Sequence, residues 1–152
     1  MMKRVAAVGA AVVLGWGLGA APANASSGYW HLQNVATHDC LDFRADYGPY
    51  ATGCNEGPYQ TWLMNNAIGQ LSELRQNAGD RLCMVARNGQ ATMKPCSSSD
   101  PAALWKVYAT AAGVELINNV TKTCLGEGSG AIAHVTLVKC TGGNSQQWLA
   151  YS

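Results

Sequence analysis

The sequence predicts an all-β domain built from three copies of one short repeat, closed around a pseudo-threefold axis. The first observation is the spacing of Trp62, Trp105 and Trp148, which lie 43 residues apart at each step. The second is that the 6 cysteines fall into pairs at matching intervals. The third is that each copy contains short apolar stretches broken by Gly, Pro, Asn and Asp, without sustained helical periodicity. We therefore expect roughly four short strands in each repeat and roughly twelve in all.

Further residues recur at fixed positions in the three copies. The first cysteine of each pair is Cys40, Cys83 or Cys124, and an asparagine stands six residues before it, as Asn34, Asn77 and Asn118. The second cysteine is Cys54, Cys96 or Cys140. A fixed period of this length indicates a repeat architecture. We place the repeats at about residues 28–66, 67–110 and 111–152.

Closure into a ring is the arrangement that these repeats favour. A single repeat is too small to bury a core, whereas three repeats around one axis would bring their tryptophans together near the middle. A stacked solenoid is the alternative, because it also buries a core between neighbouring repeats. Equal periods centred on tryptophan, without distinct caps, favour closure, which also removes exposed strand edges.

The first 25 residues have the features of a secretory signal. Lys3 and Arg4 precede an apolar stretch from Val5 to Ala21, and Ala23-Asn24-Ala25 is a small-x-small cleavage site. The apolar stretch is shorter than the roughly 20 residues that span a bilayer. A retained N-terminal anchor is the alternative. We expect a secreted protein without a membrane anchor, whose single domain covers residues 26–152.

The charge of this domain excludes two classes of partner. Of the 10 Lys and Arg residues, two lie in the signal, which leaves 8 against 9 Asp and Glu. Binding to nucleic acid or to an anionic membrane depends on a basic surface, which this composition does not provide. The composition therefore favours an uncharged ligand.

The cysteines are expected to form disulfides, because all of them lie in the exported part of the chain. If each unit is a copy of the others, each pair closes within its own repeat, as Cys40–Cys54, Cys83–Cys96 and Cys124–Cys140. Each bridge would then close a short loop, which contributes about 3 kcal/mol in the chain-entropy description. A zinc site is the alternative, but the C-x2-C spacing that zinc commonly uses is absent.

The repeat resembles that of the ricin B-type lectins. The resemblance rests on Cys40-Leu41-Asp42 followed by Gln60-Thr61-Trp62, on Cys124-Leu125 with Gln146-Gln147-Trp148, and more weakly on Cys83-Met84 with Leu104-Trp105. It covers the whole domain and implies a β-trefoil. It also implies binding of galactose-type sugars, or of xylan and related polymers, through up to three shallow pockets.

The resemblance implies a sugar-binding carboxylate two residues after the first cysteine. Asp42, Val85 and Gly126 stand at that position in the three copies, so the first repeat alone keeps the carboxylate. A carboxylate suits this task because it accepts strong hydrogen bonds from neighbouring hydroxyls. Asp42 could instead fix a turn.

The resemblance also implies an aromatic residue two residues before the second cysteine, where this chain has Thr52, Lys94 and Val138. Tyr50 lies on the same face of the strand as Thr52 and could supply the flat surface, as could Tyr47. The expected carbohydrate-binding residues are Asp42, Tyr47, Tyr50 and Gln60. The tyrosines could also simply pack, and Gln60 and Gln146 could support the backbone.

The second and third repeats offer less to a sugar. Arg87-Asn88-Gly89-Gln90 is typical of a tight hairpin turn. Glu127 stands one position beyond the expected carboxylate, in a glycine-rich stretch without the Lys-Ser/Thr of a phosphate-binding loop.

No catalytic motif occurs, and we expect neither an enzyme nor a cofactor or metal. The polar cluster of His38, Asp39, Asp42 and Asp46 lacks the spacing of a calcium loop. The sequence therefore predicts a carbohydrate-binding module whose partner is a carbohydrate or glycoconjugate. The alternative is a trefoil that has lost its sugar sites and binds another protein, for example as an inhibitor.

Overall fold

The structure is a computed structural model. The part of the chain that it describes contains twelve strands in three sets of four. That part comprises residues 28–65, 68–130 and 132–152, so the predicted signal over residues 1–25 lies outside it. The first repeat contains β1 (Gly28–Asn34), β2 (Asp39–Arg44), β3 (Gly48–Gly53) and β4 (Trp62–Met64). The second contains β5 (Leu71–Gln76), β6 (Cys83–Arg87), β7 (Gln90–Lys94) and β8 (Leu104–Ala109). The third contains β9 (Val114–Asn118), β10 (Cys124–Glu127), β11 (Ala133–Val138) and β12 (Trp148–Tyr151).

A short 3-10 turn precedes the last strand of each repeat. These turns are η1 (Pro58–Gln60), η2 (Pro101–Ala103) and η3 (Asn144–Gln146). Each turn ends two residues before the repeat's tryptophan, which is the first residue of β4 and β12 and the second residue of β8. No α-helix occurs among the described residues.

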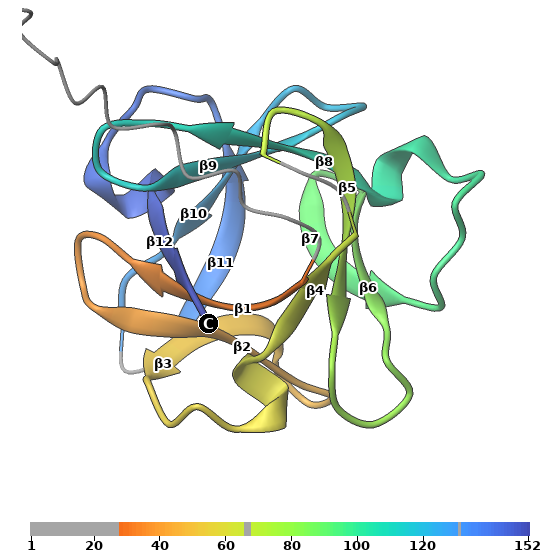
Figure 1. Cartoon of the computed structure of the whole chain (residues 1–152), viewed down its shortest axis with the longest axis horizontal. Coiled ribbons are helices and arrows are strands. Elements are labelled where there is room, and N and C mark those ends of the chain that lie inside the picture. The colour runs from red at the N-terminus through yellow and green to blue at the C-terminus, as the bar shows by residue number, and fades with distance from the viewer. Residues whose placement is uncertain (1–27, 66–67, 131) are drawn as a thin grey trace, which may run out of the picture.

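Six strands form a closed barrel. β1 pairs with β12 and β4, β5 pairs with β4 and β8, and β9 pairs with β8 and β12, all antiparallel. The first strand, in orange, therefore lies beside the last, in blue (Figure 1). A solenoid leaves its first and last units apart, so this pairing excludes the stacked alternative and confirms ring closure.

The other six strands form three hairpins, β2–β3, β6–β7 and β10–β11, which gather at one end of the barrel. β11 pairs with β3, and β7 contacts both, so the hairpins meet around the same axis. In the second hairpin Arg87 pairs with Gln90, and Asn88 and Gly89 have φ values of 51° and 74°. Positive φ at both central residues is the mark of the predicted tight turn. The β-trefoil expected from the sequence is confirmed.

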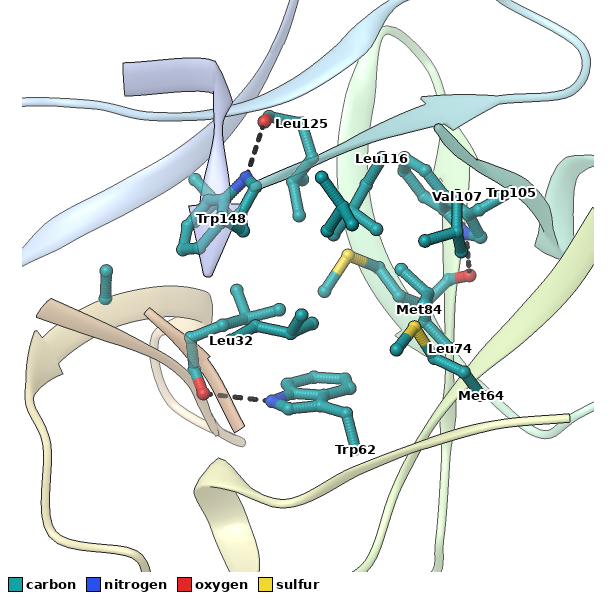
Figure 2. Packing of buried hydrophobic residues seen from close by; sticks show 14 of the residues in the cluster. Leu32, Trp62, Met64, Leu74, Met84, Trp105, Val107, Leu116, Leu125 and Trp148 are labelled. Carbon is teal, nitrogen blue, oxygen red and sulfur yellow. Dashed lines mark hydrogen bonds between the residues drawn. The ribbon is translucent and has the colours of Figure 1, made fainter. Parts of the chain in front are cut away.

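The three tryptophans anchor this arrangement. Each is 0% exposed and belongs to one continuous apolar cluster. Each indole Nε1–H donates to a main-chain carbonyl of its own repeat, at 2.9 Å to Leu41, 2.9 Å to Met84 and 3.0 Å to Leu125 (Figure 2). Those carbonyls belong to β2, β6 and β10, so each tryptophan ties the hairpin of its repeat to the barrel core.

The predicted disulfides are confirmed. The sulfur atoms of Cys40–Cys54, Cys83–Cys96 and Cys124–Cys140 are 1.99, 2.01 and 2.06 Å apart. Each bridge joins the first strand of a hairpin to the segment that follows its second strand. The zinc alternative is excluded, because these residues hold no free cysteine.

The alignment of the repeats needs one correction. Asn34 and Asn118 lie opposite Trp148 and Trp105, and their side chains donate to Ser145 O at 2.9 Å and Ala102 O at 2.8 Å. The residue opposite Trp62 is Gln76, not Asn77, and its Nε2 donates to Tyr59 O at 3.1 Å. Counted from the residue opposite the tryptophan to the first cysteine, the connection between β5 and β6 is therefore one residue longer than the corresponding connections in the other two repeats.

Replacing Trp105 by alanine should lower the free energy of unfolding by about 3–5 kcal/mol, since a large core side chain and its hydrogen bond are both lost. Urea unfolding followed by far-ultraviolet circular dichroism measures this. Tyr108→Ala is the control, because Tyr108 lies on the same strand but is 49% exposed. Equal losses in the two variants would contradict the anchoring role of Trp105.

Candidate functional site

A cleft of about 720 Å³ lies between the hairpin of the first repeat and the longer turn of the second. Asp42 and Tyr50 line it from neighbouring strands, β2 and β3, where they face each other across the pair. Asn55 and Tyr59 line it from the segment before β4. The opposite wall is the β5–β6 turn, with residues 78–80 and Leu82. The extra residue of this turn therefore lies in the wall of the cleft.

The Asp42 carboxylate is the fixed polar group of the cleft. One oxygen, Oδ1, accepts the main-chain N–H of Phe43 at 2.6 Å, and Oδ2 accepts from Gln60 Nε2 at 3.0 Å. An ionised carboxylate has roughly four lone-pair sites, so acceptor capacity remains. Asp42 is 4% exposed, so its side chain is largely enclosed by the residues around it.

Gln60 lies behind Asp42 and does not line the cleft. It is 0% exposed, its Oε1 accepts the N–H of Asn55 at 2.8 Å, and its Nε2 donates to Gly53 O at 3.1 Å as well as to Asp42. Its hydrogen bonds thus hold the chain on both sides of Cys54 and orient the Asp42 carboxylate. Among the residues predicted to bind sugar, Gln60 is placed as a support.

The same two glutamine–main-chain hydrogen bonds recur in the third repeat, without a carboxylate. The Gln146 Oε1 accepts the N–H of Thr141 at 2.8 Å, and its Nε2 donates to Lys139 O at 2.9 Å. Gly126 stands where Asp42 stands in the first repeat, so the second hydrogen on Nε2 has no carboxylate to reach there. The glutamine–main-chain bonds therefore serve the fold, and in the first repeat the glutamine also binds the Asp42 carboxylate.

The two predicted tyrosines have different positions. Tyr50 is 8% exposed and lines the cleft, and its pKa is raised, first by burial and then by the nearby Asp42 carboxylate. It is therefore a neutral phenol at physiological pH. Tyr47 does not line the cleft, and its ring packs edge-on against Tyr50 with the centroids 5.7 Å apart. The Arg44 guanidinium lies over the Tyr47 ring, 4.4 Å from its centroid.

The aromatic surface that sequence reasoning missed is Tyr59. It is 49% exposed and lines the cleft from η1, directly before Gln60. The sequence pattern pointed to the position two residues before the second cysteine, where Thr52 stands, and to the nearby Tyr47 and Tyr50. A tyrosine next to the motif glutamine was the available signal.

The cleft is more acidic than basic. Asp42, Asp46 and Asp80 contribute carboxylates, and Arg44 contributes the one guanidinium of the lining. That guanidinium is held by Asp46, with Nη2 2.9 Å from Oδ2, and by the Tyr47 ring. A neutral ligand therefore meets no repulsion here, whereas an anionic one does.

The corresponding positions of the other repeats are closed. Val85 is 1% exposed and lies within the second repeat, where the neighbouring Arg87 forms an ion pair with Asp100. In the third repeat Glu127 is 9% exposed, and its Oε2 accepts from the Thr37 hydroxyl at 2.6 Å. Burial raises the pKa of Glu127, an effect that the Thr37 hydrogen bond opposes and the nearby charge of Asp39 adds to. Through the hydrogen bond from Thr37, Glu127 holds the β1–β2 turn.

Two further features are absent from residues 28–65, 68–130 and 132–152. No group of three or more His, Cys, Asp and Glu side chains there is arranged to hold a metal ion, and the cluster of His38, Asp39, Asp42 and Asp46 is not such a group. The same residues contain no helix with the length and apolarity needed to cross a bilayer.

Comparison with known proteins gives a family and a fold. Residues 28–148 match the sequence model of the ricin-type beta-trefoil lectin domain. Among curated proteins, none matches the chain by sequence.

Solved structures of the same fold include ThreeFoil, a designed threefold-symmetric protein, with a TM-score of 0.71, 17% identity, and coverage of 82% of this chain and 98% of ThreeFoil. A Polyporus squamosus lectin, solved with the human-type influenza-binding epitope Neu5Aca2-6Galb1-4GlcNAc, has a TM-score of 0.67 and 15% identity, covering 82% of this chain and 49% of the lectin. SeviL, solved with the asialo-GM1 saccharide, has a TM-score of 0.66 and 12% identity, covering 84% and 98%. At these identities the likeness concerns the fold.

Replacing Glu127 by glutamine should stabilise the protein near pH 7. The raised pKa means that the folded state holds its proton more readily than the unfolded state, so the charged form costs stability above that pKa. Below the ordinary value of 4.5 the carboxyl is protonated in both states, and the gain should disappear. Urea midpoints at pH 7 and pH 3.5 measure this, with the exposed Glu56→Gln as the control. A gain of the same size at both pH values would contradict the assignment.

Proposed function

Because the chain belongs to the ricin-type beta-trefoil lectin domain family, we propose that it is a carbohydrate-binding protein with one sugar site, the cleft of the first repeat. The observation that carries the proposal is the Asp42 carboxylate, held in place by Gln60 and Phe43 N–H at the base of a cleft open to solvent. A sugar-binding function is also supported by two lectins of this fold that were solved with saccharides.

The cleft has the groups that a neutral sugar requires. Asp42 accepts hydrogen bonds from two adjacent hydroxyls through its remaining lone pairs. Tyr59 offers an exposed ring to the apolar C–H face of the sugar, and the Tyr50 phenol and the Asn55 amide complete the polar contacts. Tyr47 supports Tyr50 from behind in this arrangement.

The ligand class is neutral sugar, such as a galactoside or a plant or microbial polysaccharide. Three carboxylates line the cleft, and its guanidinium is already paired, so a sialylated or uronic sugar would add unfavourable charge. A single shallow site of this kind gives a dissociation constant of about 1 mM, near −4 kcal/mol. Polymeric or multivalent ligands would raise the overall strength of binding.

A second candidate function is protein binding by a trefoil without sugar sites. It is favoured by Val85 and Gly126, which replace the carboxylate in two of the three repeats. Under that hypothesis Asp42 would serve the fold alone, and no glycan would bind.

The central test is a panel of neutral and sialylated glycans against the domain of residues 26–152 and its Asp42→Asn variant. Neutral glycans should bind and sialylated ones should not. Asp42→Asn should weaken binding about tenfold or more, because hydrogen bonds to a charged acceptor contribute about 1.5–3 kcal/mol.

Asp46→Asn is the matched control for that panel. Asp46 is an exposed carboxylate of the same cleft, bound to Arg44, and its loss should leave neutral glycan binding nearly unchanged. Thermal unfolding of both variants establishes that they are folded. Neutral glycan binding that is equally strong without the Asp42 carboxylate would remove the cleft from consideration.

We further propose that the protein is secreted, with cleavage after Ala25. The basic start, the apolar stretch and Ala23-Asn24-Ala25 support this. Expression of the full chain in a host with a secretory pathway should release a protein whose first residue is Ser26. N-terminal sequencing of the exported protein measures this, and an exported protein that retained residues 1–25 would contradict it.

A further inference from the structure

A second hollow, of about 640 Å³, lies where the three hairpins meet and has no part in the cleft described above. Its lining comes from all three repeats: Tyr47 before β3 and Pro49 on β3, Gln90 and Thr92 on β7, and His134 and Thr136 on β11. We call it the axial hollow, because these hairpins surround the pseudo-threefold axis. Its size falls within the range of small-molecule sites, about 300–1,000 Å³.

The chemistry of the axial hollow suits an uncharged polar ligand. None of the described residues that line it is an aspartate, glutamate, lysine or arginine. Gln90, His134 and Thr136 are exposed, so their hydrogen-bonding groups are accessible to a ligand. Tyr47 adds a half-buried aromatic ring at the edge. Hydroxyl-binding side chains beside an aromatic surface are what a sugar unit requires.

The axial hollow and the cleft are separated by a single hairpin. The chain lines the cleft from Asp42 to Asp46 and then lines the axial hollow from Tyr47 to Pro49. Asp46 and Tyr47 are consecutive, so their Cα atoms lie about 3.8 Å apart. The two sites are therefore within reach of one extended ligand.

Two direct contacts join residues of the cleft to residues of the axial hollow. Tyr50, in the cleft, packs against Tyr47, at the axial hollow, with ring centroids 5.7 Å apart. Tyr50 also pairs with His134 across β3 and β11, strands that neighbour one another at about 4.8 Å. A sugar unit in each hollow would thus be separated by little more than the width of one strand.

We propose that the axial hollow is a second subsite for the same ligand, and that the protein binds an extended neutral oligosaccharide across the β2–β3 turn. One unit occupies the cleft at Asp42, and a unit further along the chain occupies the axial hollow between Gln90 and His134. This inference rests on the proposed sugar-binding function. It assigns to Tyr47 a position between the subsites, in place of the role in the cleft that its sequence position suggested.

The test compares a single sugar with an oligomer of it, by isothermal calorimetry on the domain of residues 26–152. The probes are galactose with β1,4-galactotetraose, and xylose with xylotetraose. In the series that binds, the tetramer of the sugar should bind about tenfold more tightly than the single sugar. The reason is that, once one unit is bound, a second unit of the same molecule reaches the second subsite at a high effective concentration. Equal affinities for the two lengths would overturn the proposal.

Thr136→Arg fills the axial hollow and tests where the added affinity arises. It should reduce tetramer affinity to that of the single sugar and leave the single sugar unaffected. Val138→Arg is the matched control, because Val138 is exposed two residues further along β11 and lines neither hollow. It should change neither affinity. Tetramer binding that Thr136→Arg leaves intact would overturn the axial subsite.

Asp42→Asn separates failure of this inference from failure of the proposed function. If it weakens both the single sugar and the tetramer, the cleft is a sugar site, and the Thr136→Arg result alone decides the axial subsite. If it weakens neither while Thr136→Arg abolishes tetramer binding, the cleft is not a sugar site, and a ligand spanning both hollows is excluded. Gln90→Ala provides a milder change at the axial hollow should the arginine variant fail to fold.

Discussion

The hydrogen bond from each tryptophan indole to a carbonyl of its own repeat is the interaction on which the rest of this structure depends. An indole buried at 0% exposure needs a partner for its N–H, and the residue after the first cysteine supplies it in every repeat. The bond fixes the hairpin relative to the barrel, and the disulfide then joins the two sides of the hairpin at its open end, beside the residue that accepts the bond. Strands β2 and β3 are held rigidly as a result, and the cleft inherits its shape from them.

The fold was almost fully predictable, because a repeated sequence reports its own symmetry. Equal spacing of the tryptophans and cysteines predicted the ring, and the same copying argument predicted the disulfide pairs. The exception was Asn77, which occupies the repeated position in the sequence while Gln76 occupies it in the structure. A spacing counted from Cys83 cannot detect a residue inserted between that cysteine and the strand before it. Hydrogen-bond register depends on the strand, so the structure was needed to place the insertion.

The site was predictable in part. The carboxylate position identified Asp42 and the first repeat, because that signal lies in one short motif next to a cysteine. The burial of Asp42 was not predictable, since nothing in Cys40-Leu41-Asp42 indicates that the Phe43 N–H and the Gln60 amide hold the carboxylate. Tyr59 and the β5–β6 wall were missed because a cleft between two repeats depends on tertiary proximity, which a reading of each repeat by itself does not contain.

The cleft uses a turn of the following repeat as its wall, and this has a consequence for how the symmetric architecture can diversify. The first repeat borrows residues 78–80 and Leu82 from the second, and the third repeat contacts Thr37 of the first through Glu127. The cleft thus lies at the seam between two units, and a lone unit would not form it. The longer β5–β6 turn reshapes one seam, so the three seams of this symmetric architecture differ around a shared interior.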